Sequence, residues 1–98
     1  MHKTKFIQQV ARETRLSQRV VADVINASHR LIEETLRKKG EVVFPGFGKF
    51  TTSERKGGKV HSIRGGKEIS YKGRRIAQFR AGAILKRAVK GDRRRWPL

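Results

Sequence analysis

Residues 40–55 read GEVVFPGFGKFTTSER and predict two short strands joined by a tight turn. EVVF at 41–44 is a β-compatible run, Pro45-Gly46 is a turn dipeptide, and FGKFTTSER at 47–55 alternates Phe50 and Thr52 with charged or polar neighbours. The centre of the chain is therefore expected to be a β-hairpin.

Two amphipathic helices are expected before this hairpin. Apolar residues recur at helical spacing over 4–14, with Thr4 as the expected N-cap, and over 18–39, with Ser17 as N-cap. The second helix should end at Gly40, because three basic residues suit the negative end of the helix dipole and glycine adopts the left-handed conformation.

A basic stretch, KGGKVHSIRGGKEISYKGRR at 56–75, follows the hairpin. It holds seven Lys or Arg, five Gly and one acid. Two β-compatible runs, 60–63 and 67–71, flank Arg64-Gly65-Gly66, and a Gly-Gly pair supplies the positive φ angles of a tight turn. We expect a two-stranded arm that becomes ordered when something anionic binds it.

The chain then returns to the body as a strand at 74–79 and a last helix at 83–90. The predicted order, α-α-β-β-arm-β-α, is that of a single α+β domain. The tail GDRRRWPL carries three consecutive arginines, expected to make an extra backbone contact, and Trp96, expected to pack on the last helix.

Charge restricts the function. With 25 basic residues against eight acids, the net charge is +17, so the partner should be a polyanion. There is no cysteine, which fits a reducing cytosol, and no apolar run long enough to span a membrane. A P-loop would need Gly in place of His61 and Ser or Thr in place of Glu68. The only adjacent carboxylates, Glu33 and Glu34, do not face each other on a helix, so no enzyme, metal, cofactor or small-molecule substrate is expected.

GEVVFPGFGKFTTSER, the arm, and FRAGAILKRAVK in this order and spacing resemble the bacterial HU/IHF family of histone-like DNA-binding proteins. KTKFIQQVARETRLSQRVVADVINA is similar to that family's paired N-terminal helices, so the resemblance covers 1–90 and leaves 91–98 as a basic tail. It implies an intertwined dimer, a homodimer or a heterodimer, with a three-stranded antiparallel sheet. Its arms, about 55–75, would wrap double-stranded DNA through the minor groove in the cytoplasmic nucleoid of a bacterium.

The resemblance also implies roles for single residues. Phe47, Phe50 and Phe79 fall on aromatic core positions, and Gly46 and Gly48 on the tight turn. The expected DNA-contacting residues are Lys3, Arg55, Lys56, Lys59, His61, Ser62, Ile63, Arg64, Lys67, Lys72, Arg74, Arg75, Arg80 and Lys86.

The arm tip departs from the family, which usually has Arg-Asn-Pro where this chain has His61-Ser62-Ile63. In the family that proline wedges between base pairs, and isoleucine is among the apolar side chains that minor-groove proteins insert. Three functions are compatible with these patterns: a dimer that bends and compacts DNA with little sequence preference, a dimer that coats or bridges DNA without strong bending, and a ribosome-associated RNA-binding protein.

Overall fold

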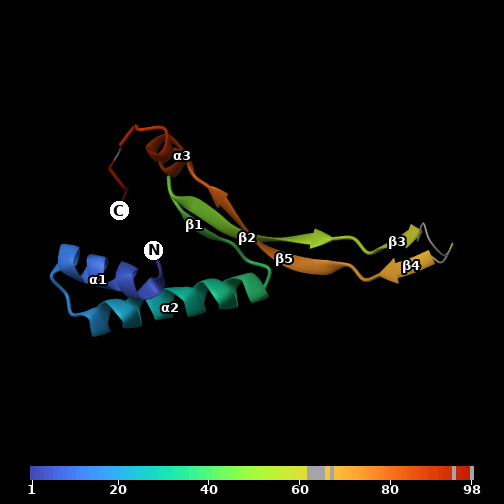
Figure 1. Cartoon of the computed structure of the whole chain (residues 1–98), viewed down its shortest axis with the longest axis horizontal. Helices are drawn as coiled ribbons and strands as arrows, with labels where there is room; N and C mark the ends of the chain where they lie inside the picture. The colour runs from blue at the N-terminus through green and yellow to red at the C-terminus, as the bar shows by residue number, and fades with distance from the viewer. Residues whose placement is uncertain (62–65, 67, 94, 98) are drawn as a thin grey trace. The chain divides into compact units, whose positions relative to one another are not determined.

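The chain folds in the order predicted from its sequence, with the arm built from two strands (Figure 1). The elements are α1 (Lys3–Thr14), α2 (Gln18–Arg37), β1 (Val42–Phe44), β2 (Gly48–Arg55), β3 (Gly58–His61), β4 (Glu68–Tyr71), β5 (Arg74–Ala81) and α3 (Ala83–Val89). The structure is a computed structural model and describes residues 1–61, 66, 68–93 and 95–97. The chain divides into two compact units, Met1–Glu34 and Thr35–Leu98. The predicted α+β class is confirmed.

The N-termini of α1 and α2 are capped differently: α2 has a side-chain cap and α1 has none. The Oγ of Ser17 accepts a hydrogen bond from the backbone N–H of Val20 at 3.1 Å, so the predicted N-cap of α2 is confirmed. The predicted cap of α1 is wrong: Thr4 lies inside the helix, and His2 precedes it without a side-chain cap. The helix starts earlier because the carbonyl of His2 already accepts the N–H of Phe6 at 3.0 Å.

The end of α2 differs from the prediction, because the helix ends at Arg37 and not at residue 39. Lys39, and not Gly40, adopts the left-handed conformation, with φ of 62°. The N–H of Gly40 donates to the carbonyl of Thr35 at 2.9 Å and that of Lys39 to the carbonyl of Leu36 at 3.0 Å, which is the Schellman pattern. A Cβ on Gly40 would lie 3.0 Å from Cγ2 of Thr35, so the glycine is there because the chain passes close to the helix.

The body sheet has the strand order β1-β2-β5 and the arm is the separate pair β3-β4, all antiparallel. The turn between β1 and β2 forms where it was predicted. The N–H of Phe47 donates to the carbonyl of Phe44 at 2.9 Å, and Gly46 has φ of 79°. Pro45 before a glycine of positive φ is the signature of a type II turn.

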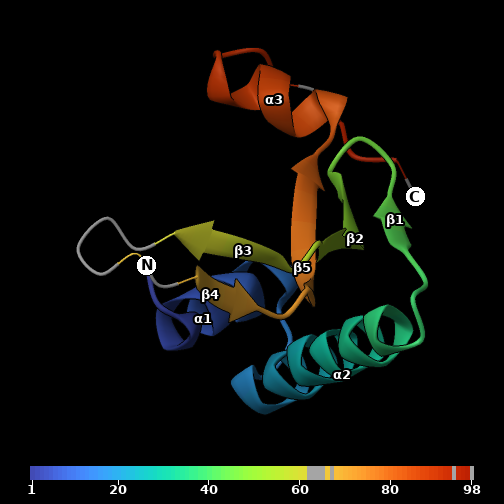
Figure 2. The same ribbon diagram turned by 90° about the vertical axis from the view of Figure 1, so that its right-hand side faces the viewer.

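This turn also holds the start of α3. The carbonyl of Gly46 accepts the N–H groups of Ile84 at 2.9 Å and Leu85 at 3.1 Å, so the turn backbone caps a helix that has no side-chain cap. The N–H of Gly82 donates to the carbonyl of Phe47 at 2.7 Å. The β1–β2 turn, Gly82 and the start of α3 therefore form one joint within the second unit, here called the glycine joint (Figure 2).

Four phenylalanines of the second unit form an aromatic cluster: Phe44, Phe47, Phe50 and Phe79. Ring centroids are 4.9 Å apart for Phe50 and Phe79 and 5.7 Å for Phe47 and Phe79. Phe47, Phe50 and Phe79 are the expected aromatic positions, and Phe44 adds to them; Phe50 is half-buried and the other three are exposed. Among the residues that the structure describes, the buried apolar side chains are Ala11 and Val21. A single chain therefore gathers the aromatic residues into a cluster that it covers only in part.

We expect Gly82→Ala to destabilise the protein more than its size suggests. The added Cβ would lie 2.5 Å from the carbonyl oxygen of Gly46, a backbone atom that cannot move without breaking the α3 cap. The expected decrease is about 1–3 kcal/mol of unfolding free energy, measured by urea denaturation. Ala83→Ser is the control, because it adds one heavy atom at the next position of the chain, where the side chain is exposed; equal effects would refute the proposed role of the joint.

Candidate nucleic-acid interface

The strand pair β2–β5 places cations directly opposite each other. Its register pairs Lys49 with Arg80 near the turn and Arg55 with Arg74 at the far end. Residues 49 and 55 are separated by an even number of positions, so both pairs lie on one face of the sheet. Like charges directly opposite each other destabilise a strand pair, so this face lowers the stability of the protein when no ligand is bound.

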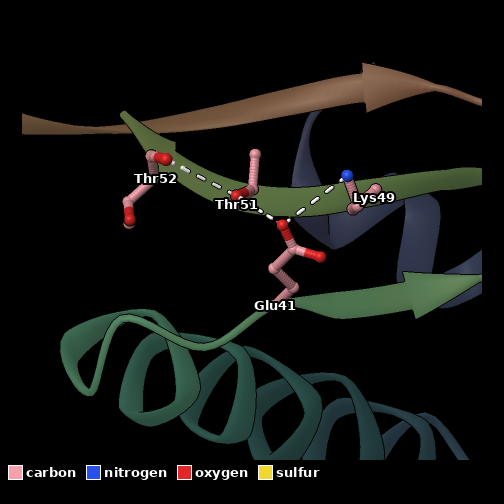
Figure 3. Close-up of polar contacts among 4 residues, drawn as sticks. All are labelled: Glu41, Lys49, Thr51 and Thr52. Carbon is pink, nitrogen blue, oxygen red and sulfur yellow. Dashed lines mark hydrogen bonds and ion pairs between the residues drawn. The ribbon is translucent and has the colours of Figure 1, made fainter. Parts of the chain in front are cut away.

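At the Lys49–Arg80 pair near the turn, a carboxylate partly neutralises the positive charge. The carboxylate of Glu41 lies 3.6 Å from Nζ of Lys49 and accepts a hydrogen bond from Oγ1 of Thr51 at 3.2 Å (Figure 3). Glu41 directly precedes β1, so the hairpin itself brings this acid beside β2. Lys49 was not among the residues predicted from the sequence, although its even spacing from Arg55 along one strand was a usable signal.

At the far end, Glu54 lines a hollow of about 320 Å³ with Arg55 and Arg74, but its carboxylate lies 3.9 Å from Nζ of Lys39. Four cations line a hollow of about 350 Å³ there: Arg55, Lys56, Lys72 and Arg74, here called the arm base. All four side chains are exposed, and among the described residues no carboxylate forms an ion pair with any of them. The sheet thus ends in a concave cluster of positive charge, which favours an anionic ligand.

The arm base is also the place where the body sheet passes into the arm. The body ladder ends at Arg55↔Arg74 and the arm ladder begins at Gly58↔Tyr71. A Cβ on Gly73 would lie 2.8 Å from the carbonyl oxygen of Arg55. Only glycine therefore allows the β4–β5 link to come this close to the end of β2. Figure 1 shows β3 and β4 following β2 and β5 beyond this point.

Arg75, which was predicted to contact DNA, has a structural contact. Its guanidinium donates to the carbonyl of Arg37, at the end of α2, at 3.0 Å. The cross-strand neighbour of Arg75 is Glu54, whose carboxylate lies 3.9 Å from Nζ of Lys39. These contacts tie the root of the arm to the C-terminal end of α2. A guanidinium has five donors, so this bond does not prevent Arg75 from also binding an anion.

The other described cations among the predicted contacts are dispersed. Lys59 is exposed on β3 and Arg80 is exposed on β5. Lys86 lines a hollow of about 340 Å³ beside α3 that is otherwise mostly apolar. In the first unit, Nζ of Lys3 donates to Oδ1 of Asn26.

Toward the arm tip, the backbone of His61 pairs with Glu68 across the arm. Gly66 has φ of 61°, as a turn glycine should. Four predicted contact residues lie outside the described residues: Ser62, Ile63, Arg64 and Lys67.

The described residues contain neither a cluster of metal-ligand side chains nor a helix able to span a membrane. No group of three or more His, Asp or Glu side chains there could hold a metal ion. In the same part of the chain, no helix combines the length and apolar character that a membrane span requires.

A three-stranded sheet that continues into a cationic two-stranded arm is typical of a class of nucleic-acid-binding proteins. The family described as "Bacterial DNA-binding protein" matches residues 1–90. DNA-binding protein HU-1 of Halalkalibacterium halodurans is 37% identical over 90 residues, which are 92% of this chain and 100% of that protein. DNA-binding protein HU of Staphylococcus aureus is 34% identical over the same shares.

Solved structures have the same fold. An Anabaena HU–DNA cocrystal structure matches with a TM-score of 0.80 and 24% identity, over 91% of this chain and 97% of that one. A variant HU from Thermotoga maritima matches with a TM-score of 0.68 and 22% identity, over 91% and 99%. The chain belongs to the HU family of bacterial DNA-binding proteins, so the resemblance seen in the sequence is confirmed.

We predict opposite effects on stability and binding when Arg55→Gln and Arg74→Gln are combined. The free protein should keep or slightly gain stability, because opposed cations cost on the order of 0.2–1 kcal/mol. The slope of log K for duplex DNA against log salt should become shallower by about 0.9 for each phosphate that is no longer neutralised.

Fluorescence anisotropy over a salt series and thermal unfolding would measure both effects. Arg12→Gln with Arg19→Gln removes the same charge from the helices and is the control. A double variant at the arm base that loses stability but keeps the wild-type slope would mean that the arm base is structural.

Proposed function

We propose that this protein is a non-catalytic architectural protein of the bacterial nucleoid that binds double-stranded DNA with little sequence preference. The observation that carries the proposal is the hollow at the arm base, whose four lining residues are all cations. DNA presents one charge per about 1.7 Å of helix axis, and each phosphate neutralised by Lys or Arg releases condensed counterions. Affinity should therefore depend steeply on salt.

The arms are proposed to follow the DNA backbone and enter the minor groove. A two-stranded ribbon is narrow, and Lys59 and the arm base place cations along it. The minor groove mainly separates A·T from G·C pairs, so a protein that reads it selects sequences weakly. This favours contacts to phosphate and groove shape over direct reading of bases.

The functional unit is proposed to be an intertwined homodimer. Val20 and Val24 of α2 are 45% and 57% exposed, and Phe44 and Phe79 of the aromatic cluster are each 43% exposed in a single chain. A domain of this size needs most of its apolar surface covered to be stable. A second copy offers matching apolar surface, while a related chain could form a heterodimer in the same way.

Bending is the proposed consequence of binding, with Ile63 as the wedge. Apolar side chains inserted between base steps unstack them and kink the duplex. The alternative, coating or bridging without strong bending, keeps the same arm contacts without this insertion. RNA binding has less support, because the family is one of DNA-binding proteins.

The dimer is tested by sedimentation and by the dependence of Tm on concentration. Wild type should sediment as a dimer at micromolar concentration, with Tm rising as concentration rises. Val24→Glu should lower Tm strongly, because a carboxylate would be buried in the interface. Gln18→Glu adds the same charge at an exposed position of the same helix and should change little. A wild-type monomer whose Tm is independent of concentration would rule the dimer out.

Bending is tested by energy transfer between dyes at the two ends of a short duplex. Wild type should bring the ends together, and Ile63→Ala should bind with a similar salt dependence but bend less, because only the wedge is removed. The arm-base variant is the comparison, since it should weaken binding itself. Tight, salt-sensitive binding by wild type with no approach of the ends would favour the coating alternative.

A further inference from the structure

The C-terminal tail, residues 91–98, is an addition to the part of the chain that relatives share. The family match ends at residue 90, and HU-1 of H. halodurans is covered along its whole length by 90 residues of alignment. The tail holds Arg93, Arg95 and the only tryptophan of the chain. Arg94 and Leu98 lie outside the described residues.

The tail leaves α3 in a defined direction. The N–H of Asp92 donates to the carbonyl of Arg87 and that of Gly91 to the carbonyl of Ala88, each at 3.0 Å. With φ of 100° at Gly91, this is a second Schellman motif, and it reverses the chain after the helix. The residues that follow are therefore directed by backbone hydrogen bonds.

Trp96 then reaches the aromatic cluster. Its ring contacts that of Phe47 edge to face, with centroids 5.7 Å apart and planes at 65°. Trp96 and Pro97 line an apolar hollow of about 360 Å³ together with Phe44, Pro45 and Phe47. The sequence-based expectation placed Trp96 on the last helix, whereas this contact is with the β1–β2 turn. Aromatic pairs of this geometry are favourable beyond the area that they bury, so the contact can hold a short tail in place.

The anchor lies just beyond the arginines. Arg93 and Arg95 are exposed between the Schellman turn at Gly91 and the ring of Trp96. The preceding helix and its C-cap contribute three more exposed cations: Lys86, Arg87 and Lys90. Figure 2 shows the tail running from α3 toward β1. Holding arginines between two fixed points reduces the entropy that they lose when they bind a ligand.

We propose that Trp96 anchors the tail so that Arg93 and Arg95, together with the cations of α3, form a second binding surface for the phosphates of double-stranded DNA. This inference rests on the proposed function and adds a contact on the body to those of the arm. Guanidinium groups suit the ligand, because they bind phosphate oxygens with two parallel hydrogen bonds.

The first part of the test removes the arginines. Arg93→Gln with Arg95→Gln should make the salt slope for duplex binding shallower by about 0.9 for each phosphate that is no longer neutralised, hence by about 2 per chain. Arg12→Gln with Arg19→Gln is the charge-matched control. A tail variant that behaves like this control would overturn the proposal.

The second part removes the anchor without changing charge. Trp96→Ala should lose part of the affinity gained from the arginines, and Trp96→Phe should keep it, because phenylalanine preserves an edge-to-face contact. If Trp96→Ala binds duplex DNA with wild-type affinity, Trp96 does not anchor the tail for binding. The same conclusion holds if the variant has a lower Tm but an unchanged affinity.

The fluorescence of Trp96 reports the tail directly, because it is the only tryptophan. Iodide quenching should rise in Phe47→Leu, which removes the ring that Trp96 contacts, and should fall when DNA binds. Quenching that is unchanged in both cases would contradict the anchoring and the binding surface. If Trp96→Ala does not fold, the quenching experiment tests the anchoring and the arginine variant tests the binding surface.

The arm-base variant, measured in parallel, separates this inference from the proposed function. If the arm-base variant changes the slope and the tail variants do not, the tail inference fails and the proposed function stands. If wild type shows no salt-dependent binding to duplex DNA, the proposed function itself fails.

Discussion

The register of the β2–β5 ladder is the constraint on which the second unit depends. Pairing Phe50 with Phe79 builds the aromatic cluster on one face, and the same register places Arg55 opposite Arg74 on the other. A slip by one residue would move every side chain of a strand to the opposite face. Packing within the body and the charge presented at the arm base are therefore fixed by one set of backbone hydrogen bonds.

The glycine joint locks this register at the end near α3. The carbonyl of Gly46 caps α3 and the N–H of Gly82 donates to the carbonyl of Phe47, so backbone hydrogen bonds connect the turn to the end of β5 and to the helix. The same turn presents Phe47 to Trp96. The joint thus links the shared family fold to the tail. A substitution in the joint is therefore expected to disturb the strand register, the aromatic cluster and the tail together.

Local patterns in the sequence predicted local structure well. The Ser17 cap, the Pro45-Gly46 turn and the order of elements each depend on neighbouring residues, and the structure confirms them. Lys39 in the left-handed position was not predictable by residue type, because glycine was needed one position later for space near Thr35. The hollow at the arm base and the contact of Arg75 with the end of α2 depend on which strands pair and in which register, and no single stretch of sequence encodes that.

The arm base, the proposed DNA-binding surface, departs from the rules that stabilise a fold. The cation pair near the turn has Glu41 beside it, whereas among the described residues Arg55 and Arg74 face each other without an ion pair to a carboxylate. A carboxylate at the arm base would relieve the repulsion in the free protein, but it would also compete with phosphate for the same guanidinium groups. Leaving the charge uncompensated favours a polyanion as the partner, so binding relieves a repulsion that folding leaves in place. Gly73 keeps the two connections close enough for one ligand to meet cations from both strands.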